Sequence, residues 1–298
     1  MSAQDSATAL RRVAANHGTA LAALGVLSFS FSFPATDWAL DGFGPWTATG
    51  LRGVLAALVA GVWLAVSRVP LPERRHWPGL LTVACGCVIG FPLLTTLALR
   101  TSSTAHSAVV IGLLPLATAA FSVVLTGERP SRPFWYGAVA GAVTVIGFTL
   151  QQSHGRPTLA DAYLFAALLV CAAGYAEGGR LSRHMPGWQV IAWGVMAALP
   201  VTLAVTFLAL PSEPVHLTGR AVTGLVYVAA ISQFGGFVVW YRGMAAIGVA
   251  RASQLQLAQP LFTLVWSVLL MGERLSPVTP FTAVIVLLCI AVTQRTRG

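Results

Sequence analysis

The sequence predicts an all-α membrane protein of ten transmembrane helices, arranged as two inverted five-helix repeats around a central cavity. Of its 298 residues, 56% are hydrophobic and only 9% are charged. A soluble globular domain carries about 25% charged residues, so this chain has too little polar surface for water. A spanning helix needs about 20 apolar residues, and the length therefore allows about ten spans joined by short loops.

An internal repeat divides the chain into two halves. Residues 113–131 and 258–276 lie 145 positions apart, and ten of their nineteen aligned positions are identical. The identities include one proline, at Pro115 and Pro260, and the closing triplet Gly-Glu-Arg. Apolar composition alone would not keep these residues in register. We therefore expect a cytosolic tail over residues 1–16, a first five-helix repeat over 17–153 and a second over 154–298.

Apolar runs between charged loops predict where each span lies. In order, the expected spans are residues 18–36, 45–67, 77–99, 103–126, 133–151, 159–179, 188–209, 219–241, 249–271 and 277–293. Pro34 is expected to end or kink the first span, and Arg52 follows one or two turns into the second. Because each half holds an odd number of spans, the second half must enter the membrane from the opposite side.

The arginines predict the orientation. All eighteen basic residues are arginine. With a cytosolic N-terminus, thirteen fall on the inner side, and five fall outside or near the outer face: Arg52, Arg100, Arg156, Arg220 and Arg274. This asymmetry places both termini in the cytosol. The net charge of +9 does not indicate a nucleic-acid partner, because the arginines stand singly or in pairs at span ends.

Three prolines interrupt spans at membrane depth: Pro92, Pro115 and Pro260. A proline inside a helix frees a carbonyl group and permits a bend. Each is either a static kink or a hinge with free acceptors facing a cavity. The recurrence of one proline in both halves, as Pro115 and Pro260, favours a shared mechanical role, and we predict that the three prolines act as hinges.

The ninth span is the most polar. Gln256 and Gln259 are three positions apart and share a helix face with Ser253. Unsatisfied amides are costly in lipid, so this face must point inward. The amides either bond neighbouring helices or line a cavity, where they would pair with the amino or carboxylate group of a substrate.

Two ionisable residues are candidates for coupling, His106 and Glu177. His106 is either a hydrogen-bonded structural residue near the outer mouth or a proton-linked, substrate-contacting one. Its counterpart in the second half is Arg251. Glu177 either pairs with Arg180 or Arg183 as a structural lock or acts as a coupling carboxylate.

Aromatic side chains complete the candidate set. They either line an apolar pocket for a ring or fill ordinary membrane cores and interfacial belts. The predicted substrate-binding residues are Phe91, Thr95, His106, Tyr175, Tyr227, Gln233, Trp240, Gln256 and Gln259. Nothing in the sequence points to a catalytic residue, a metal site or a cofactor.

Three segments carry a resemblance to a known family. These are residues 98–105 (Ala-Leu-Arg-Thr-Ser-Ser-Thr-Ala), the Leu-Pro-Leu at 114–116 and the Gly-Glu-Arg-Pro-Ser at 127–131. With their weaker second copy, from Gly243 to Ser276, they resemble the drug/metabolite transporter superfamily, EamA type. Within it the chain is most similar to the YddG-type aromatic amino acid exporters. The resemblance implies a bacterial inner-membrane exporter of amino acids that works by alternating access.

We therefore expect a secondary transporter for a small metabolite, monomeric and embedded in the bilayer. Spans 1, 3, 4, 6, 8 and 9 should line its cavity, and spans 2, 5, 7 and 10 should support them. A drug or nucleotide-sugar transporter of the same fold is the alternative. A passive channel is a third possibility, and an integral-membrane enzyme is disfavoured because no His-x-x-Glu-His or Gly-x-Ser-x-Gly pattern is present.

Overall fold

The structure, a computed structural model, describes residues 3–126, 132–152, 155–247 and 255–295. Within these ranges the regular structure is helical, apart from one isolated bridge between Phe43 and Val215. Seven helical stretches are long and apolar enough to cross a membrane, and two further apolar helices are shorter. The protein is therefore a multi-pass membrane protein, while the number of ten spans stays a prediction.

The first half contains α1 (Ala3–Ser30), α2 (Ser32–Leu40), α3 (Pro45–Val66), η1 (Arg74–His76), α4 (Trp77–Val83), η2 (Ala84–Gly90), α5 (Phe91–Leu99), α6 (Thr104–Ile111), α7 (Leu114–Thr126) and α8 (Arg132–Gln152). The second half contains α9 (Leu159–Leu181), α10 (Gly187–Ala209), α11 (Gly219–Val226), η3 (Tyr227–Gly235), α12 (Gly236–Ile247), α14 (Ala258–Met271) and α15 (Val278–Arg295). Because α1 begins at Ala3, the segment expected as a tail continues the first helix.

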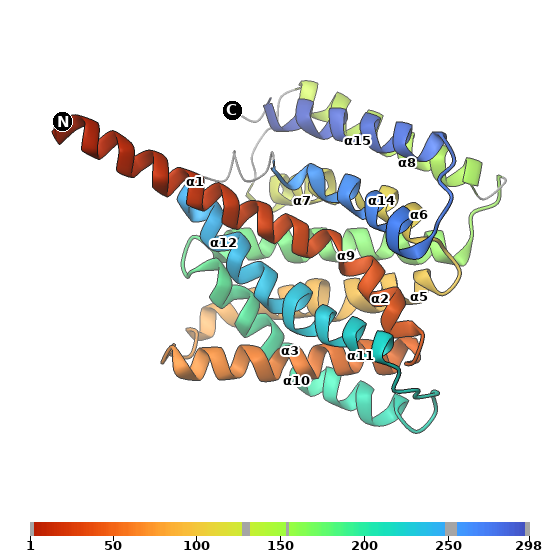
Figure 1. Ribbon diagram of the computed structural model, residues 1–298. Coiled ribbons are helices and arrows are strands. Elements are labelled where there is room, and N and C mark those ends of the chain that lie inside the picture. The colour runs from red at the N-terminus through yellow and green to blue at the C-terminus, as the bar shows by residue number, and fades with distance from the viewer. Residues whose placement is uncertain (1–2, 127–131, 153–154, 248–254, 296–298) are drawn as a thin grey trace.

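The helices form one bundle with paired helices at its edges (Figure 1). Helix α3 packs along α10 at one edge, and α8 packs along α15 at the opposite edge. Between these pairs, α1 lies along α12, and α9 contacts both α5 and α7. The two edge pairs join helices of like position in the two halves. The contacts of α1 with α12 and of α9 with α5 and α7 join helices of unlike position, so the central helices of the halves interlock.

Helix breaks recur at the repeat distance. The segments η2 and η3 are both π-helical, and they end at Gly90 and Gly235, which are 145 residues apart. A turn at Gly112 separates α6 from α7, and a turn at Leu257, again 145 residues later, precedes α14. The prolines predict interruptions in spans 3, 4 and 9, whereas no break is expected in span 8 and no π-helical segment in either span 3 or span 8. π-helical turns are frequent at functional sites.

Prolines explain three of the breaks. A proline ring clashes with the carbonyl group four residues earlier and cannot donate to it. That position is Ile111 for Pro115 and Gln256 for Pro260, and in each case a turn follows directly. For Pro34 it is Ser30, the last residue of α1. The first span is therefore broken at Phe31, three residues before the proline expected to kink it.

Three features named from the sequence lie outside the described residues: the first Gly-Glu-Arg at 127–129, Arg251 and Ser253.

Candidate functional site

A central cavity with two adjoining lobes lies between the halves. The larger lobe has a volume of about 220 Å³, and the smaller one of about 70 Å³. The residues that line both lobes are Phe33, Ile111, Leu114, Tyr175, Gln256, Gln259 and Thr263. Since these side chains come from both repeats, either half alone would leave the cavity open.

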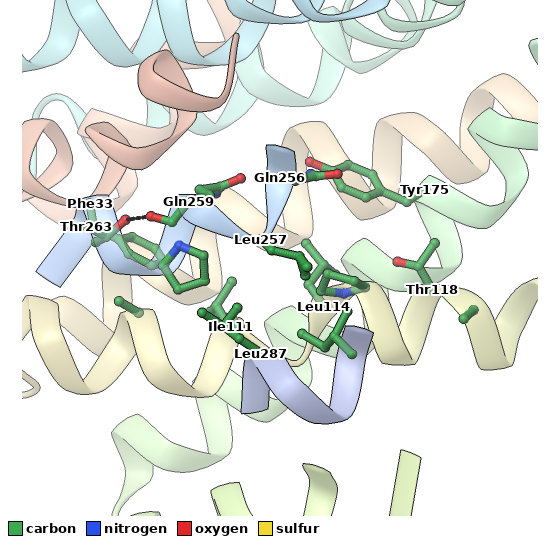
Figure 2. A pocket seen from close by; sticks show the side chains of 16 residues that line it. Phe33, Ile111, Leu114, Thr118, Tyr175, Gln256, Leu257, Gln259, Thr263 and Leu287 are labelled. Carbon is green, nitrogen blue, oxygen red and sulfur yellow. Dashed lines mark hydrogen bonds between the residues drawn. The ribbon is translucent and has the colours of Figure 1, made fainter. Parts of the chain in front are cut away.

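The two broken helices form the wall of the larger lobe. Ile111 and Gly112 line it at one break, and Leu257 lines it at the other. Figure 2 shows Gln256, which lies just before α14, and Gln259, which lies in its first turn, together with Tyr175 of α9. The breaks thus bring backbone turns and polar side chains to an otherwise apolar surface.

Polar groups in the larger lobe are only partly satisfied. The side-chain amides of Gln256 and Gln259 form no hydrogen bond to another described residue. The buried hydroxyl of Thr118 likewise lacks a partner within the described ranges. By contrast, Thr263 donates to the Gln259 carbonyl at 3.1 Å, as Figure 2 shows, and to the Ser30 carbonyl at 2.9 Å. The amides and the Thr118 hydroxyl are therefore available to a ligand.

The smaller lobe contains a buried arginine. Arg52 is only 7% exposed, and its Nε donates to Gln233 Oε1 at 2.9 Å. Its Nη2 donates to the Ser232 hydroxyl at 3.3 Å. The Ser232 hydroxyl shares a 2.7 Å hydrogen bond with that of Ser32, and the Gln233 amide donates to the Cys87 carbonyl at 3.3 Å. This network joins α2, α3, η2 and η3 and holds the guanidinium in place.

Aromatic rings surround both lobes. The Phe33 and Phe91 ring centroids are 6.5 Å apart, and those of Tyr175 and Phe237 are 6.2 Å apart. These four side chains come from helices α2, α5, α9 and α12 and all line the smaller lobe. The cavity therefore combines one cation with neutral polar groups and apolar rings.

The structure brings five of the nine predicted substrate-binding residues to this cavity. They are Phe91, Tyr175, Gln233, Gln256 and Gln259. Of the predicted hinges, Pro115 and Pro260 line the larger lobe. Pro92 lies near the start of α5, directly after η2.

The other four predicted residues lie elsewhere, each held by a local contact. Thr95 is buried, and its hydroxyl donates to the Phe91 carbonyl at 2.7 Å. The Tyr227 hydroxyl donates to the Ser28 carbonyl at 2.9 Å. Trp240 packs in a cluster with Ala22 and Val26 of α1. None of these three side chains lines either lobe.

His106 lies at the end of the bundle and outside the central cavity. Its Nε2 is 2.8 Å from Asp161 Oδ1. Glu177 also lies away from the cavity: its carboxylate accepts hydrogen bonds from Arg180, for example from Nε at 2.9 Å. Both candidate coupling residues are therefore engaged with a charged neighbour.

Sequence reasoning missed Arg52, Ser232 and Ser32 as site residues. From the sequence, Arg52 is expected outside or near the outer face, in a span that supports the cavity. The available signal was its place about two turns inside an apolar run without an acidic residue nearby in the sequence. Span 10 also contributes, through Leu287 and Ile290, so the expected division between lining and supporting spans was wrong.

Several contacts between the halves gather at one end of the bundle, here called the distal end. It comprises the loops at 41–44, 100–103, 210–218 and 272–277, and Figure 1 shows it opposite the start of α1. The Glu273 carboxylate accepts from the backbone N–H groups of Thr104 at 2.7 Å and Ala105 at 2.9 Å. Glu213 likewise accepts from Thr47 at 2.7 Å. Each carboxylate caps a helix of the other half.

Known proteins resemble this chain over most of its length. The EamA-like transporter family matches residues 16–150 and again residues 158–294. "Uncharacterized transporter YdeK" of Bacillus subtilis is 43% identical over 272 residues, 91% of this chain and 95% of that protein. "Aromatic amino acid exporter YddG" of Ancylobacter novellus is 29% identical, covering 73% of this chain and 74% of its own.

A solved crystal structure that is 20% identical superposes with a TM-score of 0.65, covering 93% of this chain and 97% of its own. At that identity the likeness shows the fold alone. The family match, in contrast, spans both halves and agrees with the internal repeat. The chain belongs to the EamA-like transporter family.

Proposed function

We propose that this protein is a secondary transporter that exports a small metabolite across the inner membrane, with neutral or aromatic amino acids as the first choice. The observation that carries this proposal is the central cavity, which is built from both halves and holds free polar groups among aromatic rings. The printed name of the YddG relative supports the same substrate class. The protein is proposed as a transporter and not as an enzyme.

We further propose that the halves are inverted five-helix repeats, with ten spans and both termini in the cytosol. The breaks that recur at a spacing of 145 residues support this arrangement. The helix contacts support it as well. The contact of α1 with α12 corresponds, when the halves are exchanged, to the contact of α9 with α5. Under the same exchange the pairs α3–α10 and α8–α15 each map onto themselves.

Alternating access gives the distal contacts a role in transport. The N–H groups at a helix start carry a partial positive charge, which a carboxylate stabilises. Glu273 places its carboxylate on the first N–H groups of α6 and so ties α14 of the second half to α6 of the first. We propose that these bonds keep the distal end closed and that they break when the cavity opens to that side.

Reconstitution into liposomes tests the function. Liposomes that contain the full chain would be loaded with an unlabelled amino acid. Uptake of the same amino acid in labelled form would then be followed at several pH gradients. Saturable counterflow of one substrate class is expected. Flux that rises linearly with concentration and shows no counterflow would indicate a channel, and no flux above protein-free liposomes for the whole panel would contradict the proposal.

A matched pair of variants ties the flux to the cavity. Replacing Gln256 and Gln259 with leucine removes two free amides of the larger lobe and should lower counterflow at least tenfold. Thr144→Val on the exposed face of α8 removes a local bond to the Ala140 carbonyl and should leave counterflow unchanged. Equal counterflow in both variants would show that the substrate passes elsewhere.

A further inference from the structure

The strongest unexplained feature of the cavity is the charge of Arg52. An arginine side chain stays protonated in proteins, and a buried charge is costly unless it is paired. Arg52 is 7% exposed, yet no carboxylate among the described residues lies within 4.0 Å of it. None of the described residues that line the two lobes is an aspartate or a glutamate. The described part of the chain therefore leaves this positive charge uncompensated.

The partners of Arg52 orient the guanidinium and leave much of it unused. Gln233 accepts from Nε, and Ser232 accepts from Nη2. A guanidinium has five N–H donors, and those on Nη1 have no partner among the described residues. Carboxylates bind such a planar fork through two parallel hydrogen bonds. The free donors in the smaller lobe thus match a carboxylate group.

The rest of the cavity restricts what that carboxylate is attached to. The rings of Phe91 and Tyr175 lie near the arginine, and the larger lobe adds Leu114 and Ile111. An amino group would meet the amide oxygens of Gln256 and Gln259 and no carboxylate. These surroundings suit an apolar or aromatic body better than a polyamine or a cationic drug, which would be repelled by Arg52.

Resting on the proposed transport function, we infer that Arg52, oriented by Gln233 and Ser232, binds the carboxylate of the substrate. The transported class is then small monocarboxylates with an apolar or aromatic body, neutral amino acids included. Arg52 is the specificity-determining residue of the smaller lobe, and removal of the substrate's carboxylate should abolish recognition.

Competition in counterflow tests this inference with four related compounds. They are phenylalanine, phenylalanine amide, phenethylamine and 3-phenylpropionate, each used against labelled phenylalanine. For the wild type, the two carboxylates should compete at least tenfold better than the amide and the amine. Arg52→Gln should lose at least tenfold of counterflow, Arg52→Lys should retain part of it, and Arg242→Gln should behave as the wild type. Arg242 is the matched control, because its guanidinium lies over Trp63 outside the cavity.

Thermal unfolding of the same detergent-purified proteins separates the subsite from the transport function. The carboxylates should raise the melting temperature of the wild type and of Arg242→Gln, and they should not raise that of Arg52→Gln. If no compound is transported but this Arg52-dependent shift is seen, the subsite stands and the proposed amino acid export fails. Equal competition by acid and amide in the wild type overturns the inference. The inference is also overturned if the carboxylates do not raise the melting temperature, or if they raise it equally in the wild type and in Arg52→Gln. If Arg52→Gln does not fold, Arg52→Lys is compared with the wild type instead.

Discussion

Arg52 and His106 are both buried ionisable side chains that contact the other half, and they differ in that His106 has a carboxylate partner. At the distal end, His106 lies 2.8 Å from Asp161, and these side chains are 11% and 3% exposed. In the cavity, the hydrogen-bond partners of Arg52 among the described residues are the Gln233 amide and the Ser232 hydroxyl. A paired group has its interactions satisfied by the fold, whereas an unpaired cation keeps its capacity to bind. The comparison therefore separates a structural contact from a binding group.

The largest expected effect is the loss of stability when the His106–Asp161 pair is broken. Asp161→Ala removes the acceptor of His106 and also the cap of α9, where Asp161 Oδ2 accepts from the Thr158 N–H at 2.8 Å. Loss of a buried pair together with a cap should cost about 3 kcal/mol of unfolding free energy. Thermal unfolding in detergent measures it, and Asp161→Asn, which keeps one oxygen acceptor, should lose less. An Asp161→Ala protein that melts with the wild type would show that this pair is not structural.

A smaller effect, on transport, is expected when Arg52 is given a carboxylate partner within the protein. Gln233→Glu has nearly the same shape and would place a carboxylate oxygen where Gln233 Oε1 now accepts from Arg52. This internal carboxylate should take the place of the substrate's carboxylate on Arg52. The loss should be about 2 kcal/mol of binding free energy, which lowers counterflow roughly 30-fold. The protein should still fold, because the buried charge is then paired.

Gln256→Glu is the control for that variant, since it adds the same acid to the cavity at a residue without a described hydrogen bond to Arg52. A lesser loss of counterflow is expected from it. If Gln233→Glu transports at the wild-type rate, the charge of Arg52 has no part in binding.

The smallest effect concerns the closure of the distal end. Glu273→Gln weakens the carboxylate cap of α6 by about 1 kcal/mol, which would change the ratio of open to closed states roughly fivefold. Labelling of Ile111→Cys from the distal side, in a background without the native cysteines, would measure that ratio, because Ile111 lines both lobes.

Glu213→Gln offers a matched comparison, because it weakens the same kind of cap on α3. Helices α3 and α10 pack tightly, with Gly50 against Thr206 and Gly53 against Thr202. We expect these helices to stay together, so labelling of Ile111→Cys should not change. Equal labelling in both variants would contradict the assignment of Glu273 to the closure.

Much of the architecture could be predicted from local sequence. Low charge indicated a membrane protein, and the repeated proline and Gly-Glu-Arg indicated two related halves. The prolines also indicated where helices bend, although the breaks fall up to three residues earlier because the clash is with the carbonyl group of a preceding residue. The π-helical segments were not predicted, since nothing in their composition distinguishes them from ordinary helix.

The site was predicted less well, because its geometry depends on partners distant in sequence. Arg52 meets Gln233 across 181 positions, and His106 meets Asp161 across 55. Local position predicts Arg52 outside or near the outer face and makes His106 a candidate for substrate binding. The structure places Arg52 in the wall of the smaller lobe and His106 beside Asp161, outside the cavity, and a substrate role for His106 stays a prediction. Gln256 and Gln259 do line the cavity, because their polarity in an apolar run leaves them only an inward direction, and their contact with a substrate stays a prediction.

The most direct test of the account is a structure of the protein with a transported carboxylate bound. The predicted result is a carboxylate oxygen within about 3.2 Å of the Arg52 guanidinium, with the body of the molecule among Phe91 and Tyr175. A ligand whose carboxylate lies elsewhere, with Arg52 still bonded only to Gln233 and Ser232, would contradict it.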